Sequence, residues 1–343
     1  EPAAGDSRPG ADADADELVD QVIDDVARWL RSADELATRS ERATSARLSG
    51  VVADPVGLAF TMAFVDRVVR PDDDRVAARQ LASVVDQHRL PGFLGPVDRL
   101  LLRAGARLAP MLPRVVMPLA RRRMRAIVGH LVVDADDRRM ASHFADRREE
   151  GFDLNVNLLG EAVLGETEAV RRFERSLSLL GQPSVDYVSV KVSSIVSQLN
   201  HWDHDGSKDR ILERLRVLMR RAATTSPPTF VNLDMEEYHD LELTIDVFTE
   251  LLGEPEFHPF DAGIVLQAYL PDSFDALRAL VDWATARRER LVEGRPGGEV
   301  KIRLVKGANL AMERVDAAIH GWEQAPYRSK AETDANYKRC LDH

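Results

Sequence analysis

The chain has 343 residues, which exceeds the roughly 250–300 residues that a single hydrophobic core usually supports. We therefore expect a main domain and a smaller one. The apolar content of 44% and the charged content of 30% are typical of a soluble globular protein. The formal net charge of -11 disfavours nucleic acid as a partner, because binding to phosphates needs a basic surface.

Cysteine content and hydropathy indicate a cytoplasmic protein. The single cysteine, Cys340, excludes an internal disulfide and fits a reducing compartment. No apolar run approaches the roughly 18 residues needed to span a bilayer, and no signal peptide is visible. The chain begins with Glu1 and ends at His343 without an evident stop, so we expect a trimmed piece of a longer protein.

The first part of the chain is predicted to be helical and to carry no chemistry. Residues 1–14 are acidic and poor in bulky side chains, which predicts a disordered tail. Residues 15–150 show helical periodicity and are predicted to form a helical arm and an accessory α-domain. This part has no metal-ligand spacing, Gly-rich phosphate loop or nucleophile motif, and we expect no metal site in the chain.

A basic segment within this part, residues 96–133, allows two interpretations. Its arginines are Arg99, Arg103, Arg107, Arg114, Arg121, Arg122, Arg123 and Arg125. They could form a face that contacts an anionic membrane. The interpretation that we favour is a solvated helix face that pairs with acidic residues elsewhere in an acidic protein.

After residue 150 the hydrophobic pattern changes to strands that alternate with amphipathic helices. The predicted strands lie at residues 154–160, 187–192, 229–234, 263–269 and 300–309. Alternation of this kind implies a parallel sheet with right-handed crossovers. No Gly-x-Gly-x-x-Gly motif follows the first strand, which disfavours a dinucleotide-binding Rossmann domain.

A (β/α)8 barrel of the TIM type fits this pattern better. The five βα units occupy about 190 residues, whereas a complete barrel takes about 250. We therefore predict a partial barrel over residues 151–343, in which about five βα units are present and three are missing.

Each predicted strand delivers a polar side chain at or near its C-terminal end, where ligands bind in parallel barrels. These side chains are Glu161, Lys191, Asp234, Gln267 with Tyr269, and Arg303 with Lys306. Opposite charges in a partly desolvated site favour one another's ionised forms, so Lys191, Arg303 and Asp234 are expected to keep one another ionised. Two cations beside one carboxylate suit an amino acid as ligand. This chemistry does not distinguish hydride transfer from a Schiff-base lysine.

Five short motifs at these strands resemble the successive barrel strands of proline dehydrogenase, in the same order and with similar spacing. They are Asn-Leu-Leu-Gly-Glu-Ala at 157–162, Tyr-Val-Ser-Val-Lys-Val-Ser at 187–193, Asn-Leu-Asp-Met-Glu-Glu at 232–237, Leu-Gln-Ala-Tyr at 266–269 and Arg-Leu-Val-Lys-Gly-Ala at 303–308. The similarity is greatest to the bifunctional proline utilisation flavoproteins, in which an aldehyde dehydrogenase follows in the same chain. It covers residues 151–343, and the preceding helices resemble the arm and α-domain of those enzymes more weakly.

This resemblance implies a function and a set of partners. The function is FAD-dependent oxidation of L-proline to Δ1-pyrroline-5-carboxylate, the first step of proline catabolism to glutamate, with electrons passing to a membrane quinone. The implied partners are an aldehyde dehydrogenase domain beyond this chain and the inner face of the membrane, which the protein would contact peripherally.

The resemblance also implies roles for individual residues. Lys191 is expected to bind the proline carboxylate, Asp234 to lie against the amine, and Arg303 to lie beside the isoalloxazine. Glu161 is expected in a gating ion pair, and Leu304 beside the substrate. The residues expected to hold the flavin are Leu233, Gln267, Arg303, Val305, Lys306, Gly307 and Ala308.

The sequence departs from the family pattern at Asn309, where an aromatic residue often follows Lys-Gly-Ala. Two arginines of the last barrel helix and a Thr-His-Asn segment are not found before His343. Two alternatives stay open. Lys191 could be the Schiff-base lysine of a barrel aldolase or lyase, although Asp234 would keep it charged. The chain could also be an inactive fragment that serves only in assembly.

Overall fold

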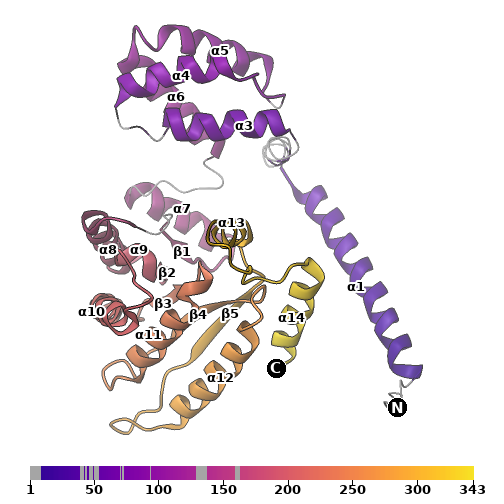
Figure 1. Cartoon of the computed structure of the whole chain (residues 1–343), viewed down its shortest axis with the longest axis vertical. Helices are drawn as coiled ribbons and strands as arrows, with labels where there is room; N and C mark the ends of the chain where they lie inside the picture. The colour runs from indigo at the N-terminus through magenta and orange to yellow at the C-terminus, as the bar shows by residue number, and fades with distance from the viewer. Residues whose placement is uncertain are drawn as a thin grey trace. The chain divides into compact units, whose positions relative to one another are not determined.

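The computed structural model describes residues 9–38, 54–69, 71, 73–92, 94–128, 137–158 and 163–343, together with the single positions 42, 45 and 49. The chain divides into two compact units, Glu1–Asp134 and Ala135–His343 (Figure 1). The sequence placed this boundary near residue 150, so the second unit contains one helix more than expected. Among the described residues, no helix combines the length and the hydrophobicity needed to cross a membrane.

The first unit is built from helices. They are α1 (Pro9–Leu36), α3 (Pro55–Phe64), the π-helical η1 (Val65–Val69), α4 (Asp74–Gln87), α5 (Pro96–Leu108) and α6 (Pro113–Val128). Helix α1 includes residues 9–14, which the sequence assigned to a disordered tail, and residues 1–8 lie outside the described residues.

Local sequence explains where these helices begin. Prolines stand at the first positions of α3, α5 and α6, where the ring costs no hydrogen bond because the first N–H groups of a helix have no partner within it. Asp54 and Asp73 cap α3 and α4 by accepting hydrogen bonds from backbone N–H groups.

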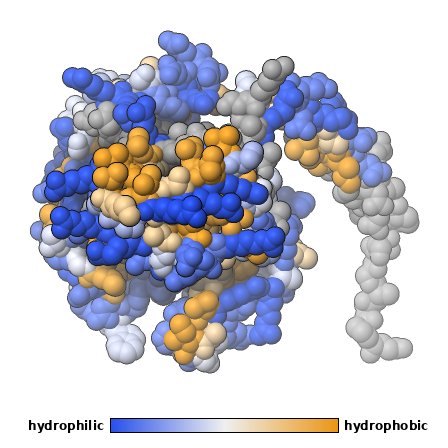
Figure 2. All heavy atoms as spheres, turned by 90° about the horizontal axis from the view of Figure 1, so that it is seen from above, coloured by the Kyte–Doolittle hydropathy of each residue, from blue (hydrophilic) through white to orange (hydrophobic). Residues whose placement is uncertain are grey.

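The helical unit has a small core and much exposed apolar surface. Its buried side chains include Phe60, Phe64, Leu81, Val84 and Met117. Hydrophobic side chains exposed along α5 and α6 and just after α5 are Val97, Leu100, Leu101, Leu108, Met111, Leu112, Val115 and Leu119. Figure 2 shows hydrophobic residues, in orange, beside hydrophilic ones, in blue, on one face of the molecule. Among the basic residues, Arg121 pairs with Asp74 at 2.6 Å, as the favoured interpretation of that segment expects.

The second unit begins with α7 (Asp137–Glu149) and then alternates strands with helices. The strands are β1 (Val156–Asn157), β2 (Tyr187–Lys191), β3 (Phe230–Asp234), β4 (Ala262–Gln267) and β5 (Val300–Val305). The other elements are α8 (Glu166–Leu180), α9 (Val192–Ile195), α10 (His204–Ala222), the 3-10 helix η2 (Tyr238–Asp240), α11 (Leu241–Gly253), α12 (Ser273–Glu289), α13 (Leu310–His320) and α14 (Lys330–Asp342).

In the described part of the chain, the five strands form one parallel sheet in the order β1-β2-β3-β4-β5. Each strand pairs with the next one along the sequence, which is the arrangement of consecutive βα units in a TIM-type barrel. The predicted fold class is therefore confirmed: five βα units of such a barrel, preceded by a helical region.

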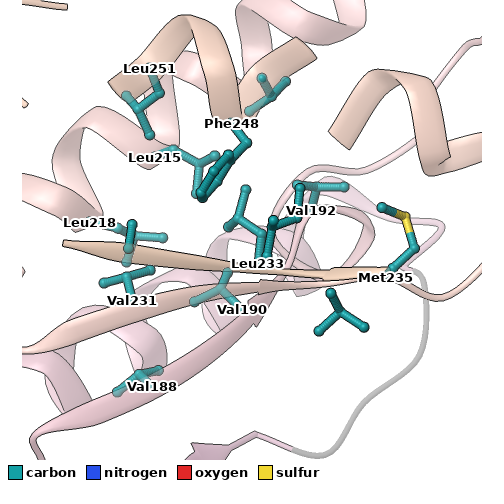
Figure 3. Packing of buried hydrophobic residues seen from close by; sticks show 14 of the residues in the cluster. Val188, Val190, Val192, Leu215, Leu218, Val231, Leu233, Met235, Phe248 and Leu251 are labelled. Carbon is teal, nitrogen blue, oxygen red and sulfur yellow. The ribbon is translucent and has the colours of Figure 1, made fainter. Parts of the chain in front are cut away.

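One face of the sheet is apolar and packs against helices. Strand side chains at alternate positions meet side chains of α10 and α11, as Figure 3 shows for Val188, Val190, Val231, Leu233, Leu215, Leu218, Phe248 and Leu251. Because strand side chains alternate between faces, the residues between these valines and leucines point to the other face. Those residues are largely polar.

Candidate active site

The face of the sheet away from the helices carries a polar network near the C-terminal ends of the strands. Its members are Asn155, Asn157, Ser189, Lys191, Asn232, Asp234, Gln267 and Arg303. The strand register sets Lys191 opposite Asp234 and Gln267 opposite Val305. Most of these residues recur at every second position of their strands, which is the spacing that brings side chains to one face.

Asp234, the last residue of β3, lies at the centre of this network. Its side chain is 7% exposed. Its carboxylate accepts hydrogen bonds from the Nδ2 atoms of Asn157 and Asn232, both at 2.9 Å, and from the guanidinium of Arg303 at 3.1 Å. The structure thus brings together the two residues that the sequence predicted as catalytic.

The charge state of Asp234 depends on burial as well as on its partners. Burial raises the pKa of its carboxyl, and the opposing effects of Arg303, of hydrogen bonds from Ser189 and Asn232, and of Lys191 are smaller. Removing this carboxylate from water thus has a larger effect on its pKa than its cationic and hydrogen-bonding partners have. The expectation that the two cations and the carboxylate keep one another ionised stays a prediction.

Lys191 ends β2, and its ammonium forms an ion pair with Glu236. The sequence did not single out Glu236, although it lies two residues after Asp234 in the same motif. Its backbone carbonyl accepts hydrogen bonds from Gln267 at 3.1 Å and from Asn309 at 2.8 Å. Asn309, where the family pattern often has an aromatic residue, therefore ties the segment after β5 to the segment after β3.

The segment after β5 requires a glycine at position 307. Gly307 has φ +123, a conformation that residues with a side chain rarely adopt. A Cβ atom there would lie 2.5 Å from the ring of Tyr269. The side chain of the preceding Lys306 pairs with Asp334 of α14 at 2.6 Å, and its backbone carbonyl accepts a hydrogen bond from the Tyr269 N–H at 2.8 Å.

Gln267 ends β4 and is 2% exposed. Its Nε2 atom donates to the Glu236 carbonyl, but among the described residues its buried Oε1 atom has no hydrogen-bond partner. An unpaired buried acceptor at a strand end marks a place where a ligand with a donor group would fit.

The other residues predicted for the site are more dispersed. Leu233 is buried in the hydrophobic cluster, and Leu304 also packs against that cluster, on the opposite face of β5 from Arg303. A substrate contact by Leu304 stays a prediction from the resemblance alone. Glu161 lies outside the described residues, and Ala308 follows Gly307 just before α13.

Two surface hollows lie elsewhere: one of about 450 Å³ among α10, α11 and α12, and one of about 390 Å³ among η2, α11 and the start of α12. Their walls include Ile245 and Asp246 of α11 but neither Asp234 nor Arg303. The chemistry of the strand ends, rather than the size of a hollow, therefore identifies the candidate site.

The fold defines the chain as a TIM-type barrel protein, and the ionic cluster near the C-terminal ends of its strands is the candidate site. The family model described as proline dehydrogenase matches residues 140–343, well over half of the chain. The chain belongs to the proline dehydrogenase family.

Curated relatives carry two kinds of name. The bifunctional protein PutA of Klebsiella aerogenes is 29% identical over 204 residues, which cover 56% of this chain and 15% of that protein. The proline dehydrogenase of Deinococcus radiodurans is 29% identical over 196 residues, which cover 56% of this chain and 53% of that protein. The chain thus spans a small part of the bifunctional relative and about half of the single-function one.

Solved structures give the same assignment. Proline utilization A from Corynebacterium freiburgense is similar with a TM-score of 0.60 and 51% identity, covering 68% of this chain and 24% of that one. The same protein from Bdellovibrio bacteriovorus, inactivated by N-propargylglycine, is similar with a TM-score of 0.64 and 28% identity, covering 86% of this chain and 29% of that one.

Proposed function

We propose that this chain is the proline-oxidising part of a flavoenzyme and that it converts L-proline to Δ1-pyrroline-5-carboxylate, the first step of proline catabolism to glutamate. The observation that carries the proposal is the ion pair between buried Asp234 and partly exposed Arg303 near the ends of β3 and β5, with Lys191 next to Asp234 in the strand register. A carboxylate between two cations suits a substrate that has both an amine and a carboxylate.

The residues present fit FAD as the cofactor. Gln267 offers a buried acceptor that lacks a partner among the described residues, and Gly307 lets the backbone after β5 pass directly against the Tyr269 ring, where a Cβ atom would collide. Arg303 offers a cation that is 39% exposed. These side chains, with backbone from Leu233, Val305, Lys306, Gly307 and Ala308, would hold the flavin. When bound, the flavin supplies the hydride acceptor.

The chain's own residues would bind and orient the substrate. In our proposal the Lys191 ammonium binds the carboxylate of proline, and Glu236 keeps that ammonium at the strand ends. Asp234 receives the substrate amine, and its raised pKa suits a group that shares a proton with an amine. Holding the ring in one orientation is the main catalytic task, because hydride transfer needs the two reacting atoms in contact.

Arg303 has a second proposed task. Its guanidinium is anchored by Asp234, so the position of the positive charge is set before any ligand binds. A pre-positioned cation stabilises the negative charge that develops on an electron acceptor. This effect would speed the redox step rather than strengthen substrate binding.

We also propose the partners that the bifunctional relatives suggest. An aldehyde dehydrogenase domain would follow in the same polypeptide and consume the product, and a membrane quinone would reoxidise the flavin. The protein would be cytoplasmic and would contact the inner face of the membrane peripherally. Glu161 would contribute a gating ion pair.

The Schiff-base alternative has less support. A lysine that attacks a carbonyl must be uncharged, whereas Lys191 is ion-paired with Glu236. Borohydride trapping of a keto substrate on Lys191 would nevertheless restore it.

The proposed function is tested by the visible spectrum of the purified protein before and after L-proline is added without oxygen. We expect a flavin band that bleaches with L-proline and persists with D-proline. A colourless protein that takes up no added FAD would overturn the proposal. A flavin band that L-proline leaves unchanged would contradict the substrate assignment.

A further inference from the structure

A second group of ionisable side chains follows β2 and β3 but takes no part in the proposed oxidation. His201 lies between α9 and α10, and His239 and Asp240 lie in η2. Ligand atoms of these three residues lie within 4.8 Å of one another. The two imidazole rings meet edge to face with their centroids 4.5 Å apart, and His201 Nε2 lies 3.6 Å from Asp240 Oδ1.

Asp240 is a buried acid in an acidic environment. It is 5% exposed, and in the part of the chain that the structure describes no hydrogen-bond donor reaches its carboxylate. The carboxylates of Glu237, Glu236 and Glu313 are also close enough to act on it. A buried carboxylate without donors is unfavourable unless a cation lies beside it.

A further carboxylate orients one of the two imidazoles. His239 Nε2 lies 2.6 Å from Glu237 Oε2, which holds the ring in place. Histidines that bind metals usually donate their other ring N–H to a carboxylate or a carbonyl, and such a contact selects the tautomer. The group therefore contains three potential ligands and one orienting residue.

We propose that His201, His239 and Asp240 bind one divalent transition-metal ion of the class that Zn²⁺ represents. Two imidazoles with one carboxylate suit Zn²⁺, whereas Mg²⁺ and Ca²⁺ prefer oxygen ligands. Three protein ligands leave a position for water, as in zinc sites that are not fully closed. The site does not form a short sequence motif, because its ligands come from two segments separated by α10 and β3.

Metal binding would connect the segment after β2 to the segment after β3. The first continues from Lys191 and the second contains Glu236, the residues that form an ion pair beside the proposed substrate site. The ion would therefore hold together the two segments that position Lys191, the residue proposed to bind the carboxylate of the substrate.

The proposal is tested by titrating chelator-stripped protein with Co²⁺, a coloured substitute for Zn²⁺. We expect one Co²⁺ per chain, ligand-field absorption typical of imidazole coordination, and displacement by Zn²⁺. His201→Gln and His239→Gln should each weaken binding at least about tenfold, since loss of an orienting contact alone costs about that much. His204→Gln is the matched control, because His204 begins α10 and pairs with Asp246 at 2.8 Å, outside the group.

Misfolding is separated from ligand loss by Glu237→Gln. This variant keeps all three ligands, so its Co²⁺ bands should stay while its affinity falls about tenfold. The proposal is overturned if stripped wild-type protein binds no Co²⁺, if His201→Gln and His239→Gln bind it as wild type does, or if His204→Gln weakens binding equally. The readout is metal binding, so it does not depend on the proposed oxidation of proline.

Discussion

The two units of this protein use the same residue type in opposite ways, and aspartate shows this clearly. In the helical unit Asp73 lies exposed before α4, and hydrogen bonds from the backbone N–H groups of Arg75 and Val76 hold its pKa below the ordinary value. In the barrel unit Asp234 is buried, and burial raises its pKa even though Arg303 is adjacent. A solvated capping carboxylate stabilises its fold, whereas a buried carboxylate costs stability and is a candidate for chemistry.

The same contrast extends to packing. The helical unit buries a few apolar side chains and exposes many along α5 and α6. The sheet unit buries apolar side chains on its helix-covered face and gathers amides and charges on the other. Only the second arrangement brings polar groups from several strands into mutual contact, and for this reason the candidate site lies there.

The largest effect is expected from Asp234→Ala, which removes the carboxylate that accepts hydrogen bonds from Asn157, Asn232 and Arg303. If Asp234 holds the substrate amine, L-proline turnover should fall about 100-fold or more while the flavin is retained, because orientation of the substrate is lost. Dye-coupled proline oxidation and the flavin absorbance measure the two quantities. Asp73→Ala is the matched control and should keep full specific activity. Undiminished turnover in Asp234→Ala would remove this residue from the site.

A smaller effect is expected from Arg303→Met, which keeps a long side chain and removes the charge. We expect flavin reduction by L-proline to slow about tenfold or flavin binding to weaken, since a pre-positioned cation is lost. Stopped-flow absorbance and the flavin content of the purified variant report these changes. Arg278→Met, at an exposed position 3.9 Å from Asp275, should change neither. Normal flavin content together with normal reduction kinetics would contradict the role of Arg303.

Gly307→Ala tests the segment after β5 through two separate costs. The alanine would adopt φ +123 unfavourably, and its Cβ atom would meet the Tyr269 ring at 2.5 Å. We expect the free energy of unfolding to fall by more than about 1 kcal/mol and the flavin content to fall with it. Gly151→Ala is the control, because Gly151 has φ +90 and a Cβ atom added there would have no atom of the described residues within 4 Å. Equal losses in both variants would show that the Tyr269 contact has no cost.

The smallest effects concern pH, and they should have opposite signs in the two units. The pKa of Asp234 is raised above its ordinary value of 3.8, so the folded protein binds more protons than the unfolded chain, and ionisation lowers stability as pH rises above that value. Asp234→Asn should therefore gain stability relative to wild type as pH rises. The pKa of Asp73 is lowered from 3.8, so its contribution is present above that value and is lost as pH falls.

The Asp73→Asn variant should accordingly be less stable than wild type above about pH 4, and the difference in stability should disappear at acidic pH. Urea unfolding at a series of pH values from about 3 to 7 measures both differences. Parallel trends in the two variants would contradict the assignment of opposite environments to the two aspartates.

Much of the barrel unit could be predicted from hydrophobic pattern. The five strands appear in the predicted order, and β2 and β3 lie within a residue of their expected bounds. The pairing of Asp234 with Arg303 also follows from their positions near the ends of strands in one sheet. The roles of Asn157 and Asn232 were missed, although polar residues at every second strand position are a signal that the sequence contains.

Other features are invisible in the sequence because they depend on partners far away in the chain. Arg287 is 4% exposed and donates to the carbonyls of Leu252, Phe257, His258, Phe260 and Gly298, and burial lowers its pKa to about 10. In the sequence it is one of several arginines at the end of a helix. Glu236 is likewise one acid among many until the structure places it beside Lys191.

The sequence by itself therefore determined the alternation of strands and helices, the parallel sheet and the strand ends at which chemistry was expected. These follow from local periodicity, which each segment carries within itself. The tertiary structure decided which cation meets which carboxylate, in which direction the pKa of Asp234 moves, and that two histidines and an aspartate from separate segments converge. Those outcomes depend on distance and on access to water, and both are set only when the whole unit folds.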